Sequence, residues 1–275
     1  MKNIYFLSDA HLGSRAIEHS RTHERRLVNF LDRIKHKAEA VYLLGDMFDF
    51  WYEFKLVVPK GYTRFLGKIS ELTDMGVEVH YFVGNHDMWC GDYLEKECGV
   101  ILHREPQTCE INGKLFYMAH GDGLDYADRD WKVRLIQTIF HSSTLQRLFS
   151  MLHPRWSVEF GLEWAKHSRL KRVDGKEPPY QGEDKEGLVL YAKDYLKNHP
   201  EINYFIFGHR HIELDLMLAR ESRILILGDW INCFSYAVYD GENIFLKMTT
   251  IRFVLKLTVS TKTKSVLLGF LGKID

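Results

Sequence analysis

Five short polar motifs, each directly after a run of apolar residues, constrain this chain more than any other feature. A run such as residues 77–83 has the length and composition of a buried β-strand, so each motif begins where a predicted strand ends. The motifs are Asp9-x-His11, Gly45-Asp46-x-x-Asp49, Gly84-Asn85-His86-Asp87, His120-Gly121-Asp122 and Gly208-His209-x-His211. All of them contain Asp, Asn or His, whose oxygen and imidazole nitrogen atoms bind metals.

The recurrence of these residue types at strand ends predicts a metal centre. Two divalent cations about 3.5–4 Å apart need a bridging carboxylate and further ligands from different parts of the chain. The carboxyl ends of strands in an α/β sheet supply such positions at one edge. One motif alone is typical of a packed core or loop residue, whereas five together favour a metal site. Gly45 allows a sharp turn, so we expect Asp46 to point into the site and to be shared by both metals.

The spacing of apolar residues predicts a largely parallel sheet in the first half of the chain. Apolar residues recur at helical spacing over residues 19–37 and 66–72, and these segments alternate with predicted strands at 4–7, 41–44 and 77–83. A βαβαβ order of this kind implies parallel strands with right-handed crossovers.

The second half is predicted to add shorter strands. Asn112-Gly113 lies between two strand-like runs and is a strong hairpin signal. A helix over about residues 186–198 leads to a strand at 204–207. Four further strand-like runs follow, at 213–219, 224–227, 235–239 and 244–248. We expect these to form a second sheet packed on the first, which gives a layered α/β/β/α sandwich.

A long helical insertion follows the fourth motif, from Asp125 to about Arg172. Its apolar residues recur every three or four positions: Trp131, Leu135, Ile136, Ile139, Phe140, Leu145, Leu148, Phe149, Leu152, Trp156, Phe160 and Trp164. Helix packing within a cap explains these stripes, and a groove for a lipid is the alternative. We therefore expect a core at 1–123 and 186–250, a helical cap at 124–185 and a C-terminal tail at 251–275.

Two further segments allow two interpretations each. The aromatic stretch at residues 48–54 is either core packing or a wall of a substrate groove. The basic residues Lys166, Arg169 and Arg172 are either a solvated helix end or a binding site for phosphate or an anionic membrane.

The composition of the chain indicates which partners it can bind and in which compartment we expect it. Lys plus Arg and Asp plus Glu number 37 each, so no overall positive charge attracts nucleic acid. The four cysteines show neither a close pair nor zinc-finger spacing, so we expect reduced thiols. The first strand leaves no room for a signal peptide, and no apolar run approaches ~18 residues. We expect a cytoplasmic location, with contact at the cytoplasmic face of the inner membrane left open.

The order of the five motifs resembles the calcineurin-like metallophosphoesterase superfamily over residues 1–248. The resemblance implies one metal held by Asp9, His11, Asp46 and His211, and a second held by Asp46, Asn85, His120 and His209. Mn²⁺ is the expected metal, because mixed carboxylate, amide and imidazole ligands suit first-row divalent ions. The implied reaction is hydrolysis of a phosphate ester or anhydride.

Further roles follow from the same resemblance. His86 is expected to act as general acid or hydrogen-bond donor at the leaving group, with Asp49 and Asp87 orienting it. The residues expected to bind substrate are Asn85, His86, Lys166, Arg169 and Arg172.

Within this superfamily the chain is most similar to the UDP-2,3-diacylglucosamine diphosphatases of lipid A biosynthesis. The similarity lies in Gly45-Asp46-Met47-Phe48-Asp49-Phe50-Trp51, in the insertion after His120-Gly121-Asp122 and in Gly228-Asp229-Trp230. That family's insertion caps the site and holds two acyl chains, and its members release UMP and 2,3-diacylglucosamine 1-phosphate (lipid X). Well-known members of the family have Gly-Asn-Arg-Asp at the third motif, where this chain has Gly84-Asn85-His86-Asp87. An imidazole cannot reproduce the bidentate contact of a guanidinium with a diphosphate, so the exact substrate depends on this difference.

The sequence leaves several other functions to consider. The main alternative is hydrolysis of a soluble phosphodiester or nucleotide diphosphate, which predicts polar ligands in the cap. The neutral net charge and the apolar cap disfavour a nuclease. A non-catalytic scaffold for protein binding can lose metal ligands, whereas here all seven positions are filled. We expect an acylated UDP-sugar as substrate, no nucleic acid and no obligate protein partner.

Overall fold

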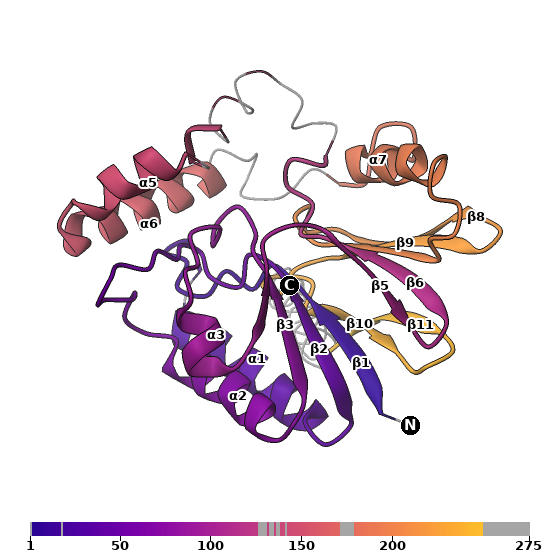
Figure 1. The fold of residues 1–275 in the computed structure, drawn as a ribbon, viewed down its shortest axis with the longest axis horizontal. Helices are drawn as coiled ribbons and strands as arrows, with labels where there is room; N and C mark the ends of the chain where they lie inside the picture. The colour runs from indigo at the N-terminus through magenta and orange to yellow at the C-terminus, as the bar shows by residue number, and fades with distance from the viewer. Residues whose placement is uncertain are drawn as a thin grey trace, which may run out of the picture.

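The computed structural model describes residues 2–17, 19–125, 131, 135, 138–140, 142–170 and 179–249. Two β-sheets pack face to face, and helices cover their outer faces (Figure 1). Side chains from both sheets form the apolar layer between them, with Phe6 and Phe116 stacked at a centroid distance of 6.0 Å. The predicted α/β/β/α architecture is confirmed.

The first sheet has six strands in the order β11-β10-β1-β2-β3-β4. Their bounds are Asn3–Leu7 for β1, Ala38–Leu44 for β2, Glu78–Phe82 for β3, Ile101–His103 for β4, Ser235–Tyr239 for β10 and Ile244–Met248 for β11. Strands β1 to β4 are parallel as predicted, and β10 runs antiparallel to β1.

The sheet assignment of β10 and β11 corrects the sequence prediction, which placed both in the second sheet. The backbone N–H of Trp230 donates to the carbonyl of Asp9 at 3.1 Å, so the chain returns to the end of β1 before β10 begins. Strand β10 therefore pairs with the free edge of β1, with Ile4 opposite Tyr239.

The second sheet has five strands in the order β5-β6-β7-β9-β8. Their bounds are Gln107–Ile111 for β5, Lys114–Met118 for β6, Tyr204–Phe207 for β7, Glu213–Ala219 for β8 and Ser222–Leu227 for β9. The predicted hairpin joins β5 to β6, and its two central residues, Asn112 and Gly113, have φ of 50° and 76° as a tight hairpin turn requires.

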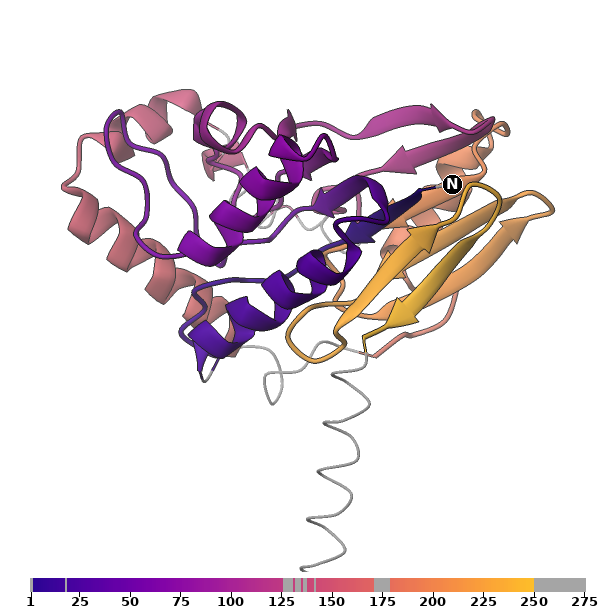
Figure 2. The same ribbon diagram turned by 90° about the horizontal axis from the view of Figure 1, so that it is seen from below.

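Helices of the described residues cover the sandwich on both sides. Helices α1 (Ser20–Ile34), α2 (Thr63–Asp74) and α3 (Tyr93–Cys98) pack on the first sheet (Figure 2), and α7 (Gly187–Leu196) packs on the second (Figure 1). The sequence predicted α1, α2 and α7, whereas α3 and β4 were not predicted. These two elements have six and three residues, too few to show a period.

The described part of the insertion contains two helices, α5 (Ser143–Ser150) and α6 (Pro154–Leu170). The hydroxyl of Tyr52 donates to the carbonyl of Gln146, and the indole N–H of Trp89 donates to the carbonyl of Phe140, both at 2.9 Å. A Cβ at Gly161 would collide with the ring of Phe50, so this glycine lets α6 approach the core closely. The cap is thus docked on the aromatic stretch, while Arg172 and the tail at 251–275 lie outside the described residues.

Within the described ranges, no helix is both long enough and apolar enough to cross a lipid bilayer.

Candidate metal centre

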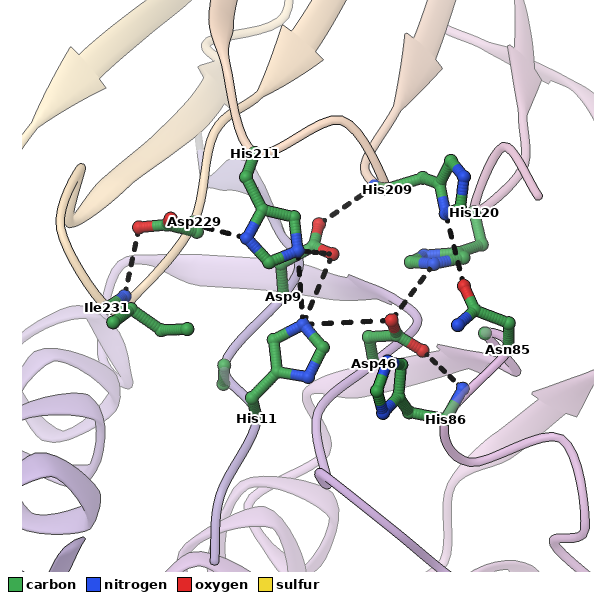
Figure 3. Close-up of polar contacts among 12 residues, drawn as sticks. Asp9, His11, Asp46, Asn85, His86, His120, His209, His211, Asp229 and Ile231 are labelled. Atoms are coloured by element: carbon green, nitrogen blue, oxygen red, sulfur yellow. Dashed lines mark hydrogen bonds and ion pairs between the residues drawn. The ribbon is translucent and has the colours of Figure 1, made fainter. Parts of the chain in front are cut away.

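The seven predicted metal ligands lie together at the carboxyl ends of five strands (Figure 3). Strands β1, β2 and β3 of the first sheet and β6 and β7 of the second each lead into one motif. The residues are Asp9, His11, Asp46, Asn85, His120, His209 and His211. The face-to-face packing of the sheets therefore brings together side chains up to 202 positions apart, from Asp9 to His211.

One group of ligands consists of Asp9, His11 and His211. The Nε2 atom of His211 lies 3.1 Å from Asp9 Oδ1 and 3.2 Å from His11 Nε2. The Nε2 atom of His11 is 3.7 Å from the same carboxylate oxygen. Two imidazole nitrogens and a carboxylate oxygen thus converge on one point, as a metal ion requires.

The second group lies on the other side of Asp46. His120 Nε2 is 3.4 Å from Asp46 Oδ2, and His209 Nδ1 is 3.1 Å from Asn85 Oδ1. Asp46 Oδ2 is also 3.7 Å from His11 Nε2, in the first group. The same carboxylate oxygen therefore faces both groups, which is the position a bridging ligand must have.

The backbone at these residues is unusual. Five of the nine described non-glycine residues with positive φ are predicted ligands, namely Asp9, His11, Asp46, His209 and His211. Non-glycine residues adopt this conformation rarely, and such strain is concentrated at functional sites. Neighbouring glycines allow the close packing: a Cβ at Gly45 would lie 2.6 Å from His120 Nδ1.

The charges at the site depend on one another. Burial alone would raise the pKa of the Asp9 carboxyl, but His211 and His11 hold it well below its ordinary value. Burial opposes ionisation of Asp46 as well, and His120 and His86 lower its pKa far enough to overcome this. Both carboxylates are therefore ionised at neutral pH and available to cations.

The histidines respond in opposite directions. Burial would lower the pKa of His211, but Asp9 and Asp229 raise it to about 9. Burial and the charge of His120 lower the pKa of His209 to about 3. A bound cation would replace the protons that His211 and His120 hold beside the carboxylates.

Contacts outside the cluster fix the orientation of its imidazoles. His120 Nδ1 is 2.8 Å from the carbonyl of Leu44, and His211 Nδ1 is 3.4 Å from Asp229 Oδ2. Each contact turns Nε2 toward the cluster, as in metal-binding histidines. The Nε2 atom of His120 is buried and forms no hydrogen bond among the described residues, and its charged contact there is the longer one to Asp46 Oδ2 at 3.4 Å. An imidazole nitrogen left in this state fits a metal ligand.

Asp229 contacts the candidate metal centre, and sequence reasoning gave it no role. Its Oδ1 accepts hydrogen bonds from the backbone N–H groups of Ile231, Asn232 and Cys233 at 3.0, 2.6 and 2.8 Å, which leaves Oδ2 for His211. The available signal was Gly228-Asp229-Trp230, which has the same strand-end position as the five motifs.

His86 and Asp49 lie beside the cluster. The Nδ1 atom of His86 is 2.8 Å from the backbone carbonyl of Asp49, and the rings of His86 and His11 are 4.8 Å apart. The carboxylate of Asp49 approaches His11 Nδ1 at 3.4 Å. Asp49 therefore contacts His86 through its main chain and His11 through its side chain.

Asp87 has a different position from the one expected. Its buried carboxylate accepts hydrogen bonds from the hydroxyl of Tyr81 at 2.6 Å and from the backbone N–H groups of Gly84 and Met47 at 2.7 and 2.8 Å. Burial and the nearby charge of Asp46 raise its pKa to about 6. These contacts join the loops after β2 and β3, which carry Asp46 and Asn85.

The predicted basic cluster is only partly visible. Lys166 lies on α6, where its Nζ is 3.6 Å from Glu163 Oε2. The side chain of Arg169 and all of Arg172 fall outside the described residues.

Comparisons with known proteins identify the family of the chain. The family model for calcineurin-like phosphoesterases matches residues 2–213. A UDP-2,3-diacylglucosamine hydrolase of Porphyromonas gingivalis is 45% identical over 253 residues, which cover 89% of this chain and 96% of that protein. A protein of the same name from Neisseria meningitidis is 30% identical over 244 residues, covering 88% and 96%. Among solved structures, a dimetal phosphatase from Danio rerio aligns over 90% of this chain and 95% of that chain, with a TM-score of 0.45 and 15% identity.

Proposed function

The chain belongs to the calcineurin-like phosphoesterase family, and from this premise we propose that it hydrolyses the diphosphate bond of UDP-2,3-diacylglucosamine. The products would be UMP and 2,3-diacylglucosamine 1-phosphate. The observation that carries the proposal is the 45% identity to a UDP-2,3-diacylglucosamine hydrolase, combined with a ligand cluster in which every expected position is filled. The predicted enzyme class, a metal-dependent hydrolase, is confirmed.

The donor set fits two divalent cations, and we propose Mn²⁺. Asp9, His11 and His211 would hold one ion, Asn85, His120 and His209 the other, and Asp46 both. When bound, the ions supply a nucleophilic hydroxide at neutral pH and neutralise charge on the phosphoryl oxygens.

His86 would protonate the leaving group. A carbonyl oxygen only accepts, so the contact with Asp49 places a proton on Nδ1 of His86. In the protonated imidazole, Nε2–H remains to donate to the departing oxygen. Asp49 would then position His86, while Asp87 would position the loops that carry Asp46 and Asn85.

The exposed apolar surface of the cap supports an acylated substrate. Trp156, Phe160 and Leu148 are 68%, 57% and 55% exposed, so packing among the described helices does not account for these positions of the stripes. We propose that residues 124–185 form the cap unit and that its apolar side chains meet acyl chains or the cytoplasmic surface of the inner membrane. Lys166, Arg169 and Arg172 would add contacts with anionic groups.

His86 also favours a second candidate. An imidazole cannot form the bidentate hydrogen bonds that a guanidinium forms with a diphosphate, so the same metal centre could prefer a soluble phosphodiester or nucleotide diphosphate. The two candidates share the chemistry at phosphorus and differ in what fills the cap.

One experiment separates them. Purified protein with Mn²⁺ is given UDP-2,3-diacylglucosamine or a non-acylated UDP-sugar in water enriched in ¹⁸O, and products are resolved by mass. We expect UMP from the acylated compound only, with the label in UMP because cleavage occurs at the uridine side. Equal or exclusive cleavage of the non-acylated compound would favour the second candidate.

A further inference from the structure

A cavity of about 790 Å³ lies beside the metal centre, on the side of His120. Gly84 and His120 contribute to its wall from the metal-binding loops, His103 and Arg104 from the end of β4, and Ser142 from the cap. Its volume is within the range of roughly 300–1,000 Å³ that small-molecule sites occupy. A ligand that fills it would therefore reach His120, a predicted ligand of the second metal.

Arg104 is held in place at this wall. Its Nη2 donates to the carbonyls of Cys90 and Gly91, at 3.0 and 2.7 Å. The same short loop is fixed in turn by Glu53, whose Oε2 accepts the backbone N–H of Tyr93 at 3.0 Å. The guanidinium is thus anchored through one nitrogen on a supported segment.

The other donors of Arg104 remain for a ligand. A guanidinium has five N–H groups in a planar fork, and the described residues provide no hydrogen-bond partner for Nε or Nη1 of Arg104. An anchored guanidinium with spare donors is suited to a phosphate oxygen.

The remaining lining argues for a nucleotide and against an acyl chain. Glu105 and Asp122 also line the cavity and can accept hydrogen bonds from ribose hydroxyls or a base, and Met88 and Leu124 offer apolar contacts to a ring. An acyl chain there would cover the spare donors of Arg104 without pairing them, which is unfavourable. The apolar side chains exposed on α5 and α6 provide a better surface for such chains.

We propose that this cavity binds the nucleoside monophosphate end of the substrate and that Arg104 contacts its phosphate. This deepens the proposed function and rests on it. Arg104 would then be a substrate-binding residue directly after β4, outside the five motifs that contain the predicted metal ligands.

The test measures binding of UMP to the Mn²⁺-loaded protein by calorimetry, with Arg104→Ala, Arg104→Lys and, as a matched control, Arg25→Ala on α1. We expect Arg104→Ala to weaken UMP binding by about 10- to 100-fold, because a charged hydrogen bond is lost. Arg104→Lys keeps the charge but loses the fork, so an intermediate affinity is expected. Arg25→Ala should bind UMP as the unaltered protein does.

Kinetics provide the second measurement. Arg104→Ala should raise KM for UDP-2,3-diacylglucosamine by a similar factor, whereas Arg25→Ala should leave this KM unchanged. Unaltered UMP affinity in both Arg104 variants would overturn the proposal, and so would weakened binding of 2,3-diacylglucosamine 1-phosphate with UMP binding intact. The calorimetry needs no turnover. Arg104-dependent UMP binding without hydrolysis of the acylated substrate would therefore overturn the substrate assignment and keep this site.

Discussion

The metal centre and the helical cap differ in how completely their side chains are partnered. In the centre, Asp9, His11 and Asp46 are almost fully buried, and each contacts at least one other predicted ligand. On the cap, large apolar side chains such as Met151 and Trp156 face solvent. The centre thus needs only cations to be complete, whereas the cap presents an apolar surface that a substrate or membrane can cover.

The two regions are also joined to the rest of the protein in different ways. The loops of the centre are held by buried hydrogen bonds, such as those of Asp87. The cap is held partly by Arg15, which pairs with the exposed carboxylates of Glu159 and Glu163 at 2.6 Å each. Exposed pairs of this kind contribute little to stability, because water and salt screen them. The cap therefore depends more on its aromatic contacts, among them Tyr52 with Phe149 at 5.0 Å.

Asp46→Asn should have the largest effect, because it neutralises the carboxylate shared by both ligand groups. Asparagine tolerates the positive φ at this position and can still accept the backbone N–H of His86, so the fold should persist. We expect Mn²⁺-dependent turnover to fall to background with an unchanged thermal melting curve. Asp92→Asn, at an exposed position, is the control. Activity close to that of the unaltered protein would remove Asp46 as the bridging ligand.

His86→Ala should lower kcat by about 10²- to 10⁴-fold, the usual contribution of a general acid. Steady-state kinetics with saturating Mn²⁺ measure this, and His199→Ala, a half-buried position after the end of α7, controls for removal of an imidazole. The seven predicted metal ligands are all retained, and Mn²⁺ titration of the variant measures whether removing His86 also affects the metal centre, since His86 lies close to His11 and Asp46. An unaltered kcat would end the proposed role of His86 and leave the metal centre as it stands.

The sequence predicted that the seven candidate ligands lie together because each motif directly follows a strand. Position in the chain therefore determined position in space for Asp9, Asp46 and His120. It did not predict a role for Asp229, because the contact with His211 depends on how the chain leaves β9 and returns to β1. Arg104 was missed for a related reason: it follows β4, which is too short to show alternation.

The fold shows the same division between local and long-range information. The hairpin at Asn112-Gly113 was predicted because its turn residues act locally. The pairing of β10 with β1 was not predicted, because it joins residues that are more than 230 positions apart in the sequence, such as Ile4 and Tyr239. For the aromatic stretch, the sequence left two interpretations. The structure has Trp51 buried in the core and Tyr52 in contact with the cap.

Asp229→Asn should weaken Mn²⁺ binding by about 10- to 100-fold, as loss of an orienting carboxylate does. The amide oxygen can still accept the backbone N–H groups of Ile231 and Asn232, but the amide nitrogen cannot accept from His211. Calorimetric titration of the metal-free protein with Mn²⁺ measures the change. Asp215→Asn, which alters a carboxylate paired with Arg223 on the second sheet, is the control. Equal Mn²⁺ affinity in both variants would show that His211 needs no such partner.

The smallest effect is expected at the cap, where Leu148→Asp combined with Met151→Asp places charge on the exposed apolar surface of α5 and the turn after it. We expect KM for UDP-2,3-diacylglucosamine to rise by about threefold to tenfold, the loss of roughly 0.7–1.4 kcal/mol of apolar contact. Hydrolysis of bis(4-nitrophenyl) phosphate, which has no acyl chain, should not change. Leu56→Asp, at a 90% exposed position on the core, is the matched control. Equal losses of activity on both substrates would mean that these side chains support the packing of the cap itself. The apolar surface of the cap would then not differ from the metal centre in needing a ligand to cover it.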